Sequence, residues 1–496
     1  MESAVKSLDK RWLVLVVLAL AQLMVVLDAT VVNIALPSAQ EDLHFSESAR
    51  QWIVTAYSLT FGSLLLLGGR ISDIFGRKWT FVGGLIGFAV ASAAGGAAPS
   101  FGVLVVARGV QGLFGAILAP AALSLLTVTF TDPQERGKAF GVFGAVAGSG
   151  AAVGLLLGGI LTEYLSWRWC LFVNVGFAVI AVVGALMLLN NVRSDADAHL
   201  DVPGTILGTG GLFCLVFGLS HAQTSSWTSG LTLVLFAIAL VALVAFIVVE
   251  RRTKHPLLPL SVVLDRDRGG SYVVVALAAI AIFAVFLFLT YYLQRNLGYS
   301  PVTSGLAFLP MVACIMFTSI TSNVKLMPIF GVKPLVTIGC VLGAAGMFYL
   351  TGLGPNESYV GSILPALILA GLGFGLIFAP AIATATLGVP ADEAGIASAM
   401  VNTSQQVGGS IGVALLSTIT ATAISDKLAE LGKPTEVNVL AAEVHGYTTA
   451  FYWAGGIFVL AAICAFGLLR AKTRPPAPGT VPAQSEPEIE TEPAGA

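Results

Sequence analysis

One carboxylate, Asp28, lies deep inside an apolar segment of the sequence. The segment opens at Trp12, and apolar residues also follow Asp28. An acid at that depth in a bilayer costs about 3 kcal/mol on insertion scales, so it is expected to serve a function. The chemistry open to it is the binding of a proton or a cation in a polar cavity. The alternative is that Asp28 lies near a helix end and is solvated.

A basic residue, Arg108, lies inside a later apolar segment and also needs a partner there. Gln111 shares its helix face at i+3. Asp28 lies roughly 140° around its own helix from Asn33. If Asn33 lines a central cavity, Asp28 points more toward a neighbouring helix, where Arg108 could meet it. The alternative is an arginine that snorkels to the surface.

The composition predicts an all-α integral membrane protein. Hydrophobic residues make up 56% of the 496 residues, charged residues only 10%, and the mean hydropathy is +0.89. A soluble chain carries about a quarter charged residues. The net charge of -2 suggests no nucleic-acid partner. The five cysteines show no metal-ligand or disulfide pattern, so we expect no metal site.

Apolar runs long enough to cross a bilayer predict fourteen transmembrane helices. An even number places both termini on one side. Most of the 25 lysines and arginines fall on that side, which predicts that both termini are cytoplasmic. The predicted layout is a six-helix bundle in 1-200, two additional helices and a connection in 201-265, a second six-helix bundle in 266-471, and a disordered cytoplasmic tail in 472-496.

The two sets of six resemble each other in the loop between their fourth and fifth helices, where each has a proline, acidic residues, a glycine and then a helix of small residues. Related halves are typical of secondary transporters, whose site lies near the midplane between them. An enzyme is disfavoured because no His-Asp, Cys-His or metal-ligand cluster faces one side of the membrane. A sensor is disfavoured because the short tail offers no output domain.

Five segments together carry a family resemblance. They are LDATVVNIALP (27–37), GRISDIFGRK (69–78), ARGVQGLFGA (107–116), SWRWCLFVNV (166–175) and YYLQRNLGYSPVTSGLAFLP (291–310). In this order they resemble the signatures of the major facilitator superfamily and of its fourteen-span drug:proton antiporter family. The resemblance implies a major facilitator fold with two extra central helices. It also implies that the Arg of the fourth span lies near the acid of the first and responds to its protonation.

The segment 69–78 can also be interpreted from its length and its charges alone. Its loop is short, and its charges could bridge helix ends in one conformation and release them in another, with a helix N-terminus as partner for the aspartate. The resemblance implies a conformational clamp between the halves, made by Gly69, Asp73, Gly76, Arg77 and Lys78. The alternative is that the basic residues only anchor the loop on the positive side.

Two further sets of residues are expected to shape the transport path. Small residues in the fifth span let helices approach closely, and the set is Gly150, Gly154, Gly158 and Gly159. The proline of the family's exporter signature is replaced there by Leu155, and the usual proline after Asn174 is absent. The predicted substrate cavity is lined by Gln22, Asn33, Tyr291, Gln294, Asn402 and Gln406. The alternative role of the amides is to join helices.

These observations predict a secondary active transporter, not an enzyme. The expected function is proton-coupled export of small amphipathic drugs or secondary metabolites across the cytoplasmic membrane. Asp28 would take up and release the proton, with Arg108 tuning its affinity. The alternative is a proton-coupled importer or facilitator of a nutrient. We expect no cofactor, partners limited to the substrate, protons and the lipid bilayer, and a functional monomer.

Overall fold

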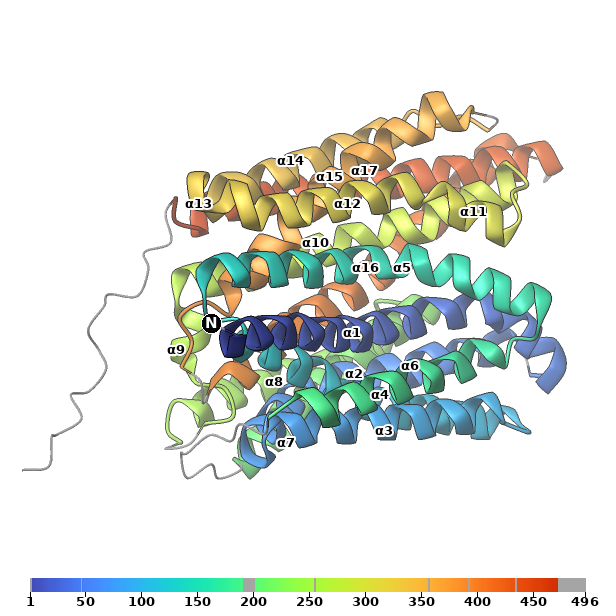
Figure 1. The fold of residues 1–496 in the computed structure, drawn as a ribbon. Helices are drawn as coiled ribbons and strands as arrows, with labels where there is room; N and C mark the ends of the chain where they lie inside the picture. The colour runs from blue at the N-terminus through green and yellow to red at the C-terminus, as the bar shows by residue number, and fades with distance from the viewer. Residues whose placement is uncertain are drawn as a thin grey trace, which may run out of the picture.

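The computed structural model describes residues 2–45, 47–190, 201–253, 256–355, 357–390, 393–432 and 435–471. Within these ranges every regular element is helical. Long helices lie side by side along one direction, and Figure 1 shows that α1 begins, and α17 finishes, at the same end of the bundle. We name this the terminal end and the other the opposite end. The predicted all-α fold is confirmed.

The first six long helices form one group. Within it α4 packs on α2 and α3, whereas α1 packs on α5 and α6. Small residues allow this close packing in a membrane: a Cβ added at Gly84 would lie 3.0 Å from the Cβ of Leu118 in α4. The helices are α1 (Glu2–Leu43), α2 (Glu47–Phe75), α3 (Arg77–Gly96), α4 (Phe101–Thr129), α5 (Pro133–Tyr164) and α6 (Trp169–Leu188).

The next two helices, α7 (Val202–Thr224) and α8 (Gly230–Glu250), pack on each other and connect to the rest through α7. α7 contacts α2 of the first group and α16 of the last. Thr55 and Ser220 join α2 to α7 by a hydrogen bond of 3.0 Å. Trp227, beyond α7, donates to Thr418 of α16 at 3.0 Å. The α7–α8 pair therefore touches both halves of the protein.

The remaining helices form a second group, in which α10 packs on α16 and α17, and α14 packs on α15 and α17. Three of the long rods contain a single wider turn. The elements are α9 (Leu260–Leu264), α10 (Arg266–Tyr291) with η1 (Tyr292–Asn296), α11 (Pro301–Ala307), α12 (Leu309–Thr321) with η2 (Ser322–Leu326) and α13 (Met327–Phe330), α14 (Val332–Leu350), η3 (Tyr359–Ile363) with α15 (Leu364–Ala385), α16 (Ala394–Leu431) and α17 (Glu436–Leu468).

Thirteen helices in the described residues are long and apolar enough to cross a membrane. The helix outside this set is α5, and the side chains of several residues in its middle lie outside the described part. The count of fourteen therefore stays a prediction, as do the exact domain bounds. The predicted tail, 472-496, lies outside the described residues.

The two groups meet along α5 and along α2. α5 packs against α11, α12, η2 and α15, and α16 packs against α2 and α4. The approach near the terminal end is close, since a Cβ at Gly137 would lie 2.8 Å from the carbonyl oxygen of Asn323. Similarly, a Cβ at Gly144 would lie 2.7 Å from the Cβ of Ala379. In this structure the halves are thus in contact near the terminal end.

Candidate proton-coupling site

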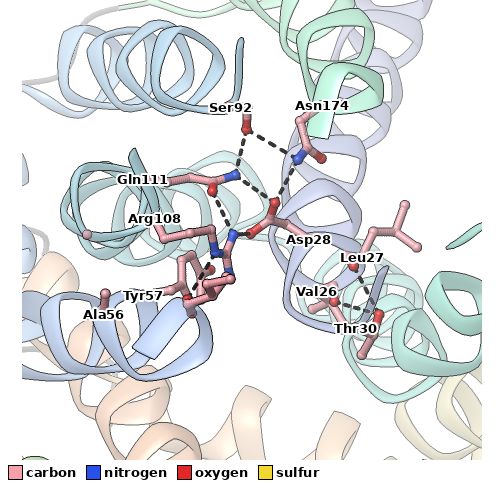
Figure 2. Close-up of polar contacts among 12 residues, drawn as sticks. Val26, Leu27, Asp28, Thr30, Ala56, Tyr57, Ser92, Arg108, Gln111 and Asn174 are labelled. Carbon is pink, nitrogen blue, oxygen red and sulfur yellow. Dashed lines mark hydrogen bonds and ion pairs between the residues drawn. The ribbon is translucent and has the colours of Figure 1, made fainter. Parts of the chain in front are cut away.

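A buried polar cluster surrounds Asp28 in α1. The carboxylate is fully buried, with 0% of its surface exposed. Its Oδ2 accepts a hydrogen bond from Arg108 Nη1 at 2.6 Å. Its Oδ1 accepts from Gln111 Nε2 at 2.6 Å and from Asn174 Nδ2 at 2.7 Å. Figure 2 shows these donors converging on the carboxylate from α4 and α6.

Arg108 is held on several sides. The same Nη1 also donates to Gln111 Oε1 at 2.6 Å, and Nε donates to the carbonyl of Ile53 at 3.4 Å. The guanidinium lies over the ring of Tyr57 in α2, 4.3 Å from the ring centroid. Arg108 is only 2% exposed. The structure therefore places Arg108 as the buried partner of Asp28, and the snorkelling alternative does not describe this conformation.

Ser92 of α3 completes the cluster. Its hydroxyl oxygen accepts from Gln111 Nε2 at 2.5 Å and from Asn174 Nδ2 at 3.3 Å. Each of the two amides thus binds both the serine and the carboxylate, and all these side chains are buried. Five helices of the first group contribute to the cluster: α1, α2, α3, α4 and α6. It therefore lies inside one half rather than between the halves.

Sequence reasoning did not place Ser92, Asn174 or Tyr57 in the site. Asn174 lies in the segment 166–175, one of the five that resemble the family, and this position was the one indication in the sequence that it belongs to a functional site. Ser92 lies in a run of small residues and Tyr57 in an ordinary apolar helix, and neither stands out by residue type.

Packing of α5 on α1 fixes the position of Asp28. A Cβ at Gly150 would lie 2.6 Å from Val26 Cγ1, and one at Gly158 would lie 3.2 Å from Val31 Cα. Gly154 faces Thr30 between them. These three predicted packing glycines thus lie against the turns of α1 on both sides of Asp28. Gly159 is buried as well.

The residues predicted to form the clamp lie at the terminal end. Asp73 Oδ1 accepts from the backbone N–H of Gly395, the second residue of α16, at 3.2 Å and from Arg77 Nη2 at 3.5 Å. A Cβ at Gly69 would lie 2.8 Å from the carbonyl oxygen of Gly395. Asp73 therefore joins α2 to the N-terminus of a helix in the other half, where negative charge is favoured.

The other clamp residues act within the first half. Gly76, with φ of 90°, makes the turn between α2 and α3, a backbone conformation that favours glycine. Lys78 Nζ donates to the carbonyls of Leu186 at 3.1 Å and Leu189 at 2.7 Å, at the C-terminal end of α6. Lys78 thus caps α6 and does not bridge the halves in this conformation.

The predicted cavity residues are dispersed. Gln406 lies between the halves, since its Cγ is 2.9 Å from the position of a Cβ at Gly62 in α2. Asn402 is buried and donates to Ser398 O in its own helix at 2.9 Å. Tyr291 is 41% exposed, and its ring centroid lies 6.4 Å from that of Tyr447 in α17.

The remaining cavity candidates are less informative. Gln22 is buried, Gln294 is half-buried, and the side chain of Asn33 lies outside the described residues. The assignment of a substrate cavity to these six residues stays a prediction. Among the described residues, no group of three or more His, Cys, Asp or Glu could hold a metal ion.

A multi-pass helical bundle of two packed halves, with a buried carboxylate–guanidinium pair in one of them, is the arrangement expected of a membrane transport protein. The Major Facilitator Superfamily model matches residues 18–413, most of the chain. The chain therefore belongs to this superfamily, as its sequence segments predict. It is a transport protein and not an enzyme, and its surroundings are the lipid bilayer.

Two relatives agree with this assignment, and one solved structure has a similar fold. The chain is 51% identical over 466 residues to the puromycin resistance protein pur8 of Streptomyces alboniger, covering 94% of this chain and 92% of that one. It is 38% identical over 420 residues to the cephamycin export protein CmcT of Amycolatopsis lactamdurans, covering 84% and 86%. The fold is similar to that of the proton:xylose symporter XylE, with a TM-score of 0.62 at 16% identity over 94% of this chain and 98% of the other.

Proposed function

We propose that this protein exports small amphipathic secondary metabolites or drugs across the cell membrane in exchange for protons. The observation that carries the proposal is the fully buried Asp28, whose two oxygens are held by a guanidinium and two side-chain amides. The names of the two relatives, one a resistance protein and one an export protein, support the outward direction. Both termini are cytoplasmic in this proposal, the monomer is functional, and the proton gradient drives transport without a cofactor.

The cluster gives Asp28 a means of coupling. The guanidinium and the two amide N–H groups stabilise the ionised carboxylate. When Asp28 binds a proton, Arg108 loses its counter-ion while still buried, which is unfavourable in a membrane interior. The cluster must then rearrange. Because α4 carries Arg108 and also packs on α16 of the other half, a movement of Arg108 reaches the interface between the halves.

A movement of Arg108 would act on the contacts between the two halves at the terminal end. In this structure Asp73 binds the N-terminus of α16, and α5 packs closely on η2 and α15. Access from the terminal side requires these contacts to open. Proton binding at Asp28 and opening at Asp73 would then be successive steps of one exchange between two conformations.

Transport in everted membrane vesicles tests the proposal. Puromycin is the first compound to test, because a 51% identical relative is named for resistance to it. An acidic vesicle interior should drive puromycin into vesicles that carry the protein, and a proton ionophore should abolish this uptake. Proton-driven movement in the opposite direction would favour the importer. Uptake that ignores the ionophore would contradict proton coupling.

A further inference from the structure

A pair of buried carboxylates lies far along the chain from Asp28, where α7 begins and α8 ends. Asp201 and Glu250 are 5% and 4% exposed. Each uses one oxygen to bind a backbone N–H: Asp201 Oδ1 accepts from Gly204 at 2.9 Å, and Glu250 Oε2 accepts from Leu258 at 3.0 Å. These bonds cap α7 and hold the segment after α8.

The other oxygen of each carboxylate is buried and makes no hydrogen bond of ordinary geometry among the described residues, although the backbone N–H of Leu257 also helps to stabilise the charge of Glu250. Both of these oxygens, Asp201 Oδ2 and Glu250 Oε1, point into the space that a side chain at Gly204 would fill. A Cβ there would clash with Asp201 Oδ2 and lie 2.6 Å from Glu250 Oε1. An ionised carboxylate has only acceptors, so two ionised groups could not satisfy each other. A single proton between them would supply the missing donor and remove the repulsion of two buried like charges.

The charges near the two carboxylates are consistent with one proton held between them. Within the part of the chain that the structure describes, the charges that act on Glu250 are those of Asp201 and of Arg70 in α2. With one proton the two carboxylates carry a single negative charge, which the positive charge of Arg70 stabilises. Leu257 and Leu258, in the segment after α8, belong to an apolar cluster that draws on α2, α7, α8 and α16; its other buried members are Leu66, Leu212, Phe246, Ile396 and Ala399.

Arg70 acts electrostatically on both this pair and the contact between the halves. It is buried and lies one helical turn after Leu66, which packs in the same apolar cluster as Leu257 and Leu258. It lies one helical turn before Asp73, and its charge acts on Asp73 as well as on Glu250. Asp73 binds the N-terminus of α16. A change of charge at the pair therefore changes the electrostatic balance at the α2–α16 contact.

We propose that Asp201 and Glu250 form a second proton-binding site, which holds one proton between its carboxylates and links α7–α8 to the α2–α16 contact through Arg70. The step is a simple proton exchange with water at the terminal end, so no other reactant is needed. Loss of the proton adds a second negative charge to the pair, which attracts Arg70 more strongly and so weakens the stabilisation of Asp73 by the charge of Arg70. The α2–α16 contact then loosens as the pH rises.

Infrared difference spectroscopy on the purified full-length protein tests whether the proton is there. The wild type should show a carboxylic-acid C=O band that disappears as the pH rises and shifts in deuterated water. Glu250→Gln, which supplies a permanent N–H donor, should lose this band. Asp28→Asn should keep it, as should Glu443→Gln, which alters a buried acid paired with Arg295 at the opposite end. A band that survives in both Glu250→Gln and Asp201→Asn would overturn the proposal.

Spin-label distances between the terminal ends of α2 and α16 test the link to the contact. In an Asp28→Asn background, raising the pH should still shift the distribution toward longer distances. Adding Glu250→Gln should abolish this shift, and Gly204→Ala should reduce it because its methyl group separates the carboxylates. A pH response that persists unchanged with Glu250→Gln would overturn the link. Neither measurement requires transport, so a negative result for the Asp201–Glu250 site does not affect the proposal for Asp28. A negative result in the transport assays of Asp28 likewise does not affect the proposal for Asp201 and Glu250.

Discussion

The Asp28–Arg108 pair makes a quantitative prediction about stability. The two charges are 2.6 Å apart and at most 2% exposed, so neither can turn to water when the other is removed. Breaking a buried pair by removing one partner costs about 3–5 kcal/mol, because the remaining charge is uncompensated. Asp28→Asn and Arg108→Gln should each lower the free energy of unfolding by about that amount. The double replacement should cost at least about 2 kcal/mol less than the sum of the two.

Unfolding of the purified proteins in mixed micelles, with SDS as denaturant, measures this cycle. The control is the pair of Arg168 and Asp42, which are 2.9 Å apart but 30% and 49% exposed. Asp42→Asn with Arg168→Gln should show a coupling of about 1 kcal/mol or less. A coupling for Asp28 and Arg108 as small as that of the control would refute the reasoning. It would mean that the buried guanidinium finds other partners once the carboxylate is gone.

Three further outcomes are expected. Ser92→Ala removes the acceptor of two amide N–H groups, so it should lower the unfolding free energy by about 1 kcal/mol and shift the pH profile of transport. Ser63→Ala, which affects only hydrogen bonds within its own helix, should leave the pH profile unchanged. Gly69→Val adds a side chain where a Cβ would already be 2.8 Å from Gly395 O, so spin-label distances between α2 and α16 should lengthen, whereas Gly83→Val, with nothing within 4 Å, should not change them. Divalent cationic dyes should be exported far less well than matched monovalent dyes, since no second carboxylate was found in the middle of a span; equal proton-driven export of both would contradict this.

The sequence predicts the fold well because hydropathy and charge report directly on membrane helices. Asp28 and Arg108 could be found for the same reason, since a charge in an apolar segment is conspicuous. Ser92 could not, because serine is common in membrane helices and only three-dimensional packing brings it to the amides of Gln111 and Asn174.

The burial of Asp201 and Glu250 and the role of Lys78 depend on which helices become neighbours. Hydropathy does not indicate which helices pack together. Asp201 and Glu250 stand at helix ends in the sequence, where a carboxylate is ordinarily solvated. Their burial follows from the packing of α7 on α8, α2 and α16. Lys78 likewise resembles a simple positive anchor in the sequence, yet it caps α6.

The central claim is that Asp28 carries the transported proton. The most direct test compares two assays of Asp28→Asn in proteoliposomes: exchange of labelled for unlabelled substrate without a gradient, and accumulation of substrate driven by a pH gradient. We predict that exchange persists, which also shows that the variant is folded, and that gradient-driven accumulation is lost. Accumulation at the wild-type level by Asp28→Asn would contradict the account.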